Sequence, residues 1–208
     1  MSSGNWLSLS VLKPDSLLFA WTVRNGLNTP VPETMSLSEM GFWKIAEADP
    51  GHLALVTPDH DEHTFGDLYE LTNRIVHGLR ALGLRRGDQV TTVLPNDLHQ
   101  VAVTLACFQG GFYFTPVNWH LVGPEIAYIV NDSETKALIV HERFAAEAVR
   151  VLPEVSVPAA NRFSVGAVDG FRPFDELIEG QPASRPDELA TGAYMFYTSG
   201  TTGRPKGV

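Results

Sequence analysis

The feature that most constrains the fold is an alternation of short predicted strands with segments of helical period. Strands are predicted at residues 53–56, 89–94, 112–117, 136–140 and 161–165, and helices are predicted between them. Strand–helix–strand units at this spacing are the units of a parallel sheet. The chain is therefore predicted to be α/β, with a mainly parallel sheet flanked by helices.

The predicted helices have recognisable ends. Thr64 and Asp67 have the spacing of a capping box, and Gly83 supplies a left-handed residue after the helix. Between them one apolar face is formed by Leu68, Leu71, Ile75, Leu79 and Leu82. Gly110 and Gly111 end the helix predicted at 98–108, and shorter helices are predicted from Gly123-Pro124 and Phe144.

The segments before and after these predicted strands and helices have a less regular pattern. Residues 35–49 are predicted to form a leading helix capped by Ser36 or Ser38, with an inward face made of Phe42, Ile45 and Ala46. Residues 58–63 are a predicted turn, and the polar segment 177–188 is a predicted surface loop.

The last fifteen residues have the composition expected of a phosphate-binding loop. Tyr194-Met-Phe-Tyr197 is an apolar run that predicts a buried strand, and Thr198 to Gly203 contains only Gly, Ser and Thr. Such a loop offers hydroxyl donors and close approach of backbone N–H groups, which a polyphosphate requires. Lys206 adds a positive charge that can neutralise phosphate oxygens.

Two alternative assignments fit this segment less well. The common P-loop pattern requires Gly-Lys followed by Ser or Thr, but Pro205 and Gly207 flank the lysine here. A flexible Gly/Ser/Thr linker would not be expected to lie between an aromatic strand and a Pro-Lys-Gly turn.

The segment Tyr197-Thr-Ser-Gly-Thr-Thr-Gly-Arg-Pro-Lys-Gly-Val208 resembles the phosphate loop of adenylate-forming enzymes, the superfamily of acyl-CoA synthetases, luciferases and peptide-synthetase adenylation domains. The resemblance implies that the ATP phosphates are bound by Thr198, Ser199, Gly200, Thr201, Thr202, Gly203 and Lys206. It also implies ATP, Mg²⁺ and coenzyme A as co-substrates. The sequence is most similar to fatty-acyl-CoA ligases, which implies a fatty acid as the carboxylic acid substrate. The intermediate would be an acyl-adenylate, whose acyl group is then transferred to the thiol with release of AMP.

The resemblance extends over residues 35–208. Segments similar to acyl-CoA synthetases begin at Thr64, Leu82, Leu94 and Pro116, whereas His120 stands where many relatives carry arginine. Residues 1–34 are an N-terminal extension to which no role is assigned. The family's magnesium-holding glutamate, ribose-binding aspartate and catalytic lysine are expected downstream of Val208, so we expect 35–208 to be the first part of an adenylation domain, with no catalytic residue or metal ligand of its own.

Composition limits the classes of function and of location that the chain can have. A net charge of −9 argues against a nucleic-acid or anionic-membrane surface, and the predicted elements leave no transmembrane segment. The single cysteine, Cys107, lies among apolar residues and fits a core position in a cytoplasmic protein. An enzyme that adenylates aryl or amino acids, and a non-catalytic remnant acting as a regulatory fragment or homodimer, are the alternative functions.

Overall fold

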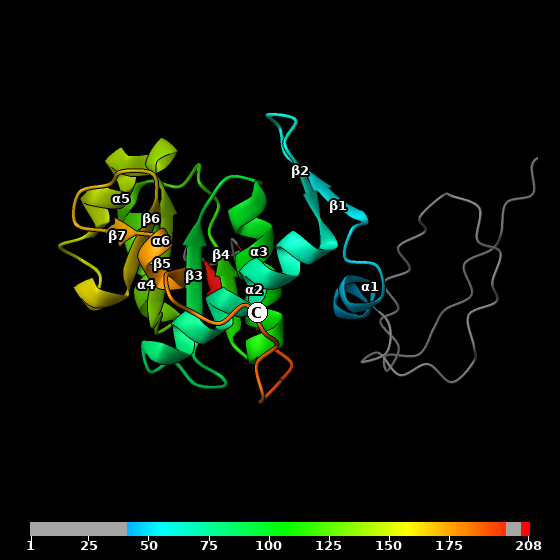
Figure 1. Ribbon diagram of the computed structural model, residues 1–208. Coiled ribbons are helices and arrows are strands. Elements are labelled where there is room, and N and C mark those ends of the chain that lie inside the picture. The colour runs from blue at the N-terminus through cyan, green and yellow to red at the C-terminus, as the bar shows by residue number, and fades with distance from the viewer. Residues whose placement is uncertain (1–40, 199–204) are drawn as a thin grey trace, which may run out of the picture. The chain divides into compact units, whose positions relative to one another are not determined.

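A six-stranded parallel sheet forms the centre of the computed structural model, which describes residues 41–198 and 205–208 (Figure 1). The strand order is β7–β6–β5–β3–β4–β8, and every neighbouring pair is parallel. The strands are β3 Gln89–Val93, β4 Tyr113–Pro116, β5 Ala137–His141, β6 Arg162–Val165, β7 Arg172–Pro173 and β8 Ala193–Tyr194. The predicted fold class is confirmed.

Helices cover both faces of this sheet. One face carries α2 Phe65–Ala81, α3 Leu98–Gly110 and α6 Asp175–Ile178, and the other carries α4 Gly123–Asp132 and α5 Ala145–Val151. Strand β5 shows why its sequence is a continuous apolar run. Ala137 and Ile139 belong to the first core cluster and Leu138 and Val140 to the second, because successive side chains of a strand point to opposite faces.

The remaining elements lie at the two ends of the described chain. Helix α1 Phe42–Ala48 is followed by an antiparallel hairpin of β1 Leu53–Val56 and β2 Glu62–Thr64. Strands β9 Tyr197–Thr198 and β10 Lys206–Gly207 form a second antiparallel hairpin, and 3-10 turns occupy Glu142–Phe144 and Ala159–Asn161. The proposed extension 1–34 and the caps Ser36 and Ser38 lie outside the described residues. Within the described ranges, no helix combines the length and the apolar character needed to cross a bilayer.

The ends predicted for α2 and the C-terminal end predicted for α3 are confirmed, whereas α1 begins at Phe42 with Gly41 as its N-cap and not at the predicted residue 35. The Thr64 side chain accepts from the Asp67 backbone N–H at 3.1 Å, and the Asp67 carboxylate accepts from the Thr64 N–H at 2.9 Å, which completes the capping box. Gly83 and Gly111 have φ angles of 92° and 78°, the left-handed conformation that ends a helix. Pro124 is the second residue of α4, after Gly123.

Three details of the core differ from the sequence predictions. Ile45 is 42% exposed, because the seven-residue α1 buries only Ala46 fully and half-buries Phe42. Leu177, assigned to a surface loop, is buried in α6, where its carbonyl lies directly over Gly78 of α2. The third is the buried strand predicted at 194–197, which the structure does not form.

Candidate functional site

The Gly/Ser/Thr segment is reached through β8, which joins the edge of the sheet beside β4. The Ala193 N–H donates to the Phe112 carbonyl at 3.3 Å, and the Met195 N–H donates to the Phe114 carbonyl at 2.9 Å. Gly192, just before the strand, is buried so closely that an added Cβ would lie 2.2 Å from the Cys107 carbonyl oxygen and 2.3 Å from that of Phe112. Only glycine therefore allows β8 to lie this close to the end of α3.

The prediction of one buried strand over 194–197 is wrong. The chain forms two separate two-residue strands, β8 and β9, and Tyr194 and Phe196 are 42% and 49% exposed. The reason is that β8 is the outermost strand of the described sheet and hydrogen-bonds only to β4. The Tyr194 ring instead contacts Phe108, and Phe196 stacks on Tyr194 with ring centroids 4.7 Å apart.

The ends of the Gly/Ser/Thr segment are brought together by the β9–β10 hairpin. Thr198 pairs with Lys206, and Tyr197 pairs with Gly207. Phe196 and Val208 then exchange two backbone hydrogen bonds, of 3.0 and 2.8 Å. The first and last predicted phosphate ligands thus lie opposite each other in this hairpin. The other five, Ser199, Gly200, Thr201, Thr202 and Gly203, lie outside the described residues.

Helix α4 holds the base of this hairpin through two side chains one turn apart. The Tyr128 hydroxyl donates to the Pro205 carbonyl at 3.1 Å, and the Tyr197 hydroxyl donates to the Asp132 carboxylate at 2.7 Å. Residues i and i+4 share one helix face, so both contacts come from the same side of α4. Burial, and then the hydrogen bond to the Asp132 carboxylate, raise the pKa of the Tyr197 hydroxyl, which keeps its proton and remains the donor.

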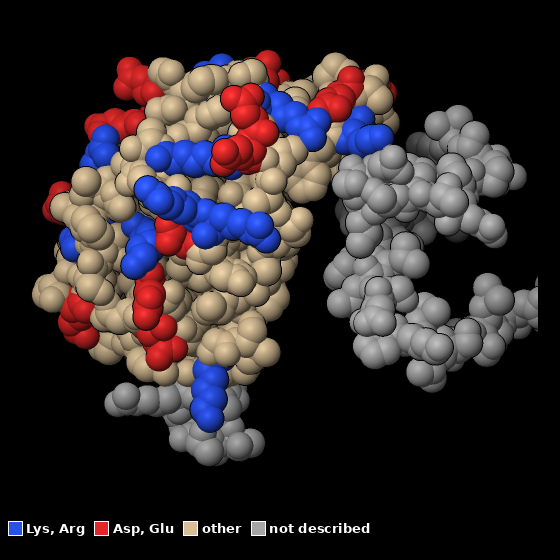
Figure 2. Space-filling view, turned by 90° about the horizontal axis from the view of Figure 1, so that it is seen from below, with Lys and Arg blue, Asp and Glu red and all other residues tan. Residues whose placement is uncertain are grey.

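The charge at the hairpin suits an anion. Lys206 is exposed, and in the part of the chain that the structure describes no carboxylate lies within ion-pair distance of it. Elsewhere basic and acidic side chains are interspersed, as the face in Figure 2 shows, which is typical of a solvated surface. Within the described residues, the Lys206 ammonium is therefore without a carboxylate partner.

A second polar and aromatic cluster follows the carboxyl ends of β4 and β5. Trp119 is 40% exposed, stacks on Phe144 at a centroid distance of 5.3 Å, and has the Arg143 guanidinium 5.8 Å from its ring. His120, the departure from the family pattern, lies against the Trp119 ring with centroids 3.5 Å apart. The chain continues from β3 to its neighbour β4 on one side and then to β5 on the other side of β3. Parallel α/β sheets bind ligands at the carboxyl ends of the strands around such a switch point. The exposed rings offer a surface on which a planar group can stack.

Motif reasoning did not find the residues that hold the hairpin. Tyr128 and Asp132 are an i, i+4 pair on the predicted helix, but nothing in the sequence indicates that their partners are Pro205 and Tyr197. Cys107 was correctly expected in the core, and burial raises the pKa of its thiol. Among residues 41–198 and 205–208, no three His, Cys, Asp or Glu side chains gather closely enough to hold a metal ion.

The described fold is a parallel α/β sheet, and its edge strand β8 is followed in the sequence by the Gly/Ser/Thr segment and Lys206, an order typical of nucleotide-binding proteins. Residues 42–208 match the family described as AMP-binding enzyme. The chain belongs to this family and to the adenylate-forming superfamily, and its sequence resemblance to that superfamily is confirmed.

Curated proteins similar to this chain include two fatty-acid ligases. The chain is 31% identical over 148 residues to the fatty acid–[acyl-carrier-protein] ligase ScoC of Streptomyces coeruleorubidus, which aligns 70% of this chain with 27% of that protein. It is 31% identical over 170 residues to the long-chain-fatty-acid–CoA ligase FadD13 of Mycobacterium tuberculosis, with 78% of this chain and 32% of that protein covered.

Among solved structures, the anthranilate CoA ligase AuaEII in complex with anthranoyl-AMP superimposes with a TM-score of 0.72 at 25% identity. The match covers 84% of this chain and 36% of that one. The chain thus spans between about a quarter and about a third of the length of these relatives.

Proposed function

We propose that the protein containing this chain is an ATP-dependent acid–thiol ligase that converts a fatty acid to its coenzyme A thioester. A carboxylate oxygen attacks the α-phosphorus of ATP, and pyrophosphate leaves with the electrons of the broken P–O bond. The thiol sulfur then attacks the acyl carbonyl carbon of the adenylate, and AMP leaves. The observation that carries this proposal is the closed hairpin of an AMP-binding family member, which places Thr198 opposite an exposed Lys206 that forms no ion pair within the described residues.

The first step is catalysed mainly by positioning and by stabilising phosphate charge. In this proposal hydroxyl groups and backbone amides of the loop donate to phosphate oxygens, glycines allow close approach, and Lys206 supplies positive charge. The full set is Thr198, Ser199, Gly200, Thr201, Thr202, Gly203 and Lys206. Mg²⁺ accompanies ATP and neutralises further phosphate charge when bound.

The contacts of Tyr128 and Asp132 give α4 a supporting role. They fix the base of the hairpin at Pro205 and Tyr197, so the two strands enter the loop at a defined spacing. Preorganisation of this kind matters because donors that are already aimed at the phosphates need no rearrangement during the reaction.

The proposal also specifies the acid substrate and the acceptor of the acyl group. The fatty-acid names of ScoC and FadD13 support a fatty acid, while AuaEII acts on anthranilate. Coenzyme A is named for FadD13 and AuaEII, and an acyl-carrier protein for ScoC. Cytoplasmic location is part of the same proposal, since the only cysteine is a free, buried thiol.

Acid-dependent exchange of labelled pyrophosphate into ATP tests the activity in the protein that contains this chain. Fatty acids of increasing length are compared with benzoate-type acids and amino acids, and coenzyme A is compared with an acyl-carrier protein as acceptor. Exchange that appears only with fatty acids, followed by thioester formation on coenzyme A, is the expected result. Exchange with aryl or amino acids alone would refute the fatty-acid assignment, and no exchange with any acid would refute the ligase.

A further inference from the structure

Three side chains on one face of α2 bind the backbone that leads into β8. The segment 183–190, called the strap below, contains no helix and only a single-residue bridge. The Asn73 amide donates to the Ala183 carbonyl at 2.7 Å, and His77 Nε2 lies 3.1 Å from the Ser184 carbonyl, to which it must donate because a carbonyl only accepts. The Arg80 guanidinium donates to the Glu188 carbonyl. Spacings of four and three residues place all three donors on one face of the helix.

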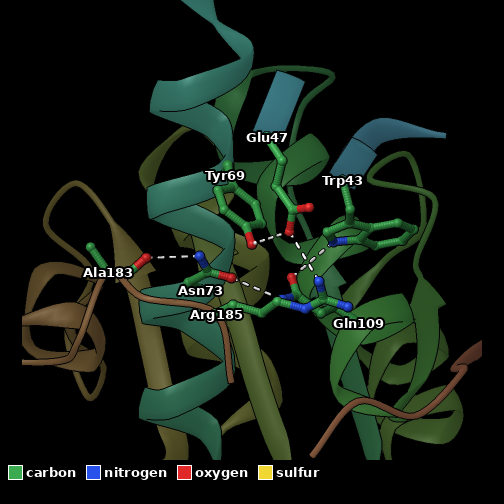
Figure 3. Close-up of polar contacts among 7 residues, drawn as sticks. All are labelled: Trp43, Glu47, Tyr69, Asn73, Gln109, Ala183 and Arg185. Carbon is green, nitrogen blue, oxygen red and sulfur yellow. Dashed lines mark hydrogen bonds and ion pairs between the residues drawn. The ribbon is translucent and has the colours of Figure 1, made fainter. Parts of the chain in front are cut away.

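Asn73 belongs to a buried chain of hydrogen bonds, which fixes its orientation (Figure 3). It is fully buried, and its Oδ1 accepts from Gln109 Nε2 at 2.8 Å. Gln109 Oε1 in turn accepts from the Trp43 indole N–H at 3.0 Å. The amide of Asn73 therefore has one orientation that satisfies both neighbours, with its NH₂ group toward the strap.

The strap also bonds to α3 through its backbone. The Ala190 N–H donates to the Gln109 carbonyl at 3.2 Å, and, just after the strap, the Gly192 N–H donates to the Phe108 carbonyl at 3.0 Å. Gln109 thus contacts the strap with its backbone and Asn73 with its side chain. The strap ends only three residues before β8, which begins at Ala193 and leads to the hairpin of Thr198 and Lys206.

A second, exposed contact holds the middle of the strap. Arg185 forms an ion pair of 3.0 Å with Glu47, which also accepts from the Tyr69 hydroxyl at 3.1 Å (Figure 3). Both charged side chains are about half exposed, and solvent-exposed pairs of this kind contribute little. The contact of the buried Asn73 amide with the Ala183 carbonyl, oriented by Gln109, is therefore the one that can hold the strap in one register.

We propose that Asn73 is a positioning residue: with Gln109 it fixes the strap against α2 and so determines where β8 and the hairpin lie. Asn73 touches neither the hairpin nor a phosphate, and it acts through the backbone of the strap. Its effect on ATP rests on the function proposed above, whereas its effect on the strap does not.

Two variants and one control test the proposal in the protein that contains this chain. Asn73→Asp keeps the shape and the acceptor for Gln109. At a pH that ionises the new carboxyl it replaces the donor to Ala183 with an acceptor, whereas a protonated carboxyl would still donate. His77→Leu removes a single donor from the half-exposed part of the same face, so it keeps the test valid if the buried variant fails to fold. Arg185→Gln removes the exposed ion pair from the same strap and serves as the control.

Amide hydrogen exchange of residues 190–195 is the first readout. Exchange is expected to rise about tenfold or more in Asn73→Asp and about two- to threefold in His77→Leu, while amides of β3 and β5 keep the wild-type rate. Arg185→Gln should leave all of them unchanged. Equal exchange of residues 190–195 in wild type and both variants would overturn the proposal.

The kinetic readout separates positioning from simple loss of stability. Both variants are expected to raise the KM for ATP, by about fivefold to tenfold in Asn73→Asp, with kcat and the KM for the acid within about twofold of wild type. An unchanged KM for ATP despite faster exchange would overturn the positioning role. If the wild-type protein has no ATP-dependent activity, the function proposed above fails, and the exchange result alone then supports or overturns the fixing of the strap.

Discussion

Replacing Gly192 by alanine should disrupt the start of β8. The new Cβ would lie 2.2 and 2.3 Å from two backbone carbonyl oxygens, about 0.8 Å closer than side-chain carbons approach such atoms. Neither carbonyl can move alone, because Cys107 lies in the last turns of α3 and Phe112 precedes β4. Forced overpacking costs about 1–3 kcal/mol, and loss of the Gly192–Phe108 hydrogen bond about 1 kcal/mol more.

The free energy of unfolding is therefore expected to fall by about 2–4 kcal/mol, which lowers the melting temperature by about 5–15 °C for a domain of this size. Thermal unfolding of the protein, followed by fluorescence, measures this. Gly51→Ala is the matched control, because an added Cβ there meets no atom within 4 Å. A melting temperature of Gly192→Ala equal to that of Gly51→Ala would refute the reasoning that close packing fixes this strand.

The other predictions concern the hairpin and a helix end. Lys206→Ala should raise the KM for ATP by about five- to thirtyfold, which corresponds to a charged hydrogen bond of about 1–2 kcal/mol at an exposed site. Lys136→Ala removes another exposed lysine and should leave this KM unchanged. Equal effects of the two variants in steady-state kinetics would contradict phosphate binding by Lys206. Tyr197→Phe loses the bond to Asp132 and should raise the same constant about two- to fivefold without changing the unfolding midpoint by more than a few degrees; an unchanged KM would count against anchoring by α4. Backbone and side-chain hydrogen bonds from the N-cap residue lower the pKa of Asp67, so its stabilising effect is present above the unfolded carboxyl pKa of about 3.9 and is lost as the pH falls below it. The stability difference between wild type and Asp67→Asn in urea titrations should accordingly shrink between about pH 6 and about pH 2, and a difference independent of pH would contradict the capping box.

Local signals in the sequence were sufficient to predict most strands of the sheet and the helices that cover it. The capping box at Thr64 and the left-handed glycines Gly83 and Gly111 act within a few residues, so their role can be inferred from spacing alone. The segment 136–140 predicted a strand, and its residues 137–140 are all apolar because both faces of β5 are covered by helices.

The errors arose where distant contacts decide the structure. Tyr194 and Phe196 are apolar enough for a buried strand, yet β8 lies at the sheet edge and leaves them half exposed. Leu177 lies in a polar segment, but the missing side chain of Gly78 creates the space in which it packs.

The candidate site could be predicted only in part. The motif identifies Thr198 and Lys206, and the hairpin pairs them. The donors that hold the surrounding backbone, such as Asn73 and Tyr128, are separated from their partners by 110 and 77 residues, and no periodic pattern reveals a contact at that distance.

Under the proposed function, this family member activates its acid by forming an adenylate. The most direct measurement uses a fatty acid labelled with ¹⁸O in both carboxylate oxygens, together with ATP and coenzyme A, and analyses the nucleotide product by mass spectrometry. Attack of the carboxylate on the α-phosphorus predicts AMP that carries one ¹⁸O atom, because the bridging oxygen leaves with AMP when the thiol attacks the carbonyl. ADP with labelled inorganic phosphate, or AMP without label, would contradict the account.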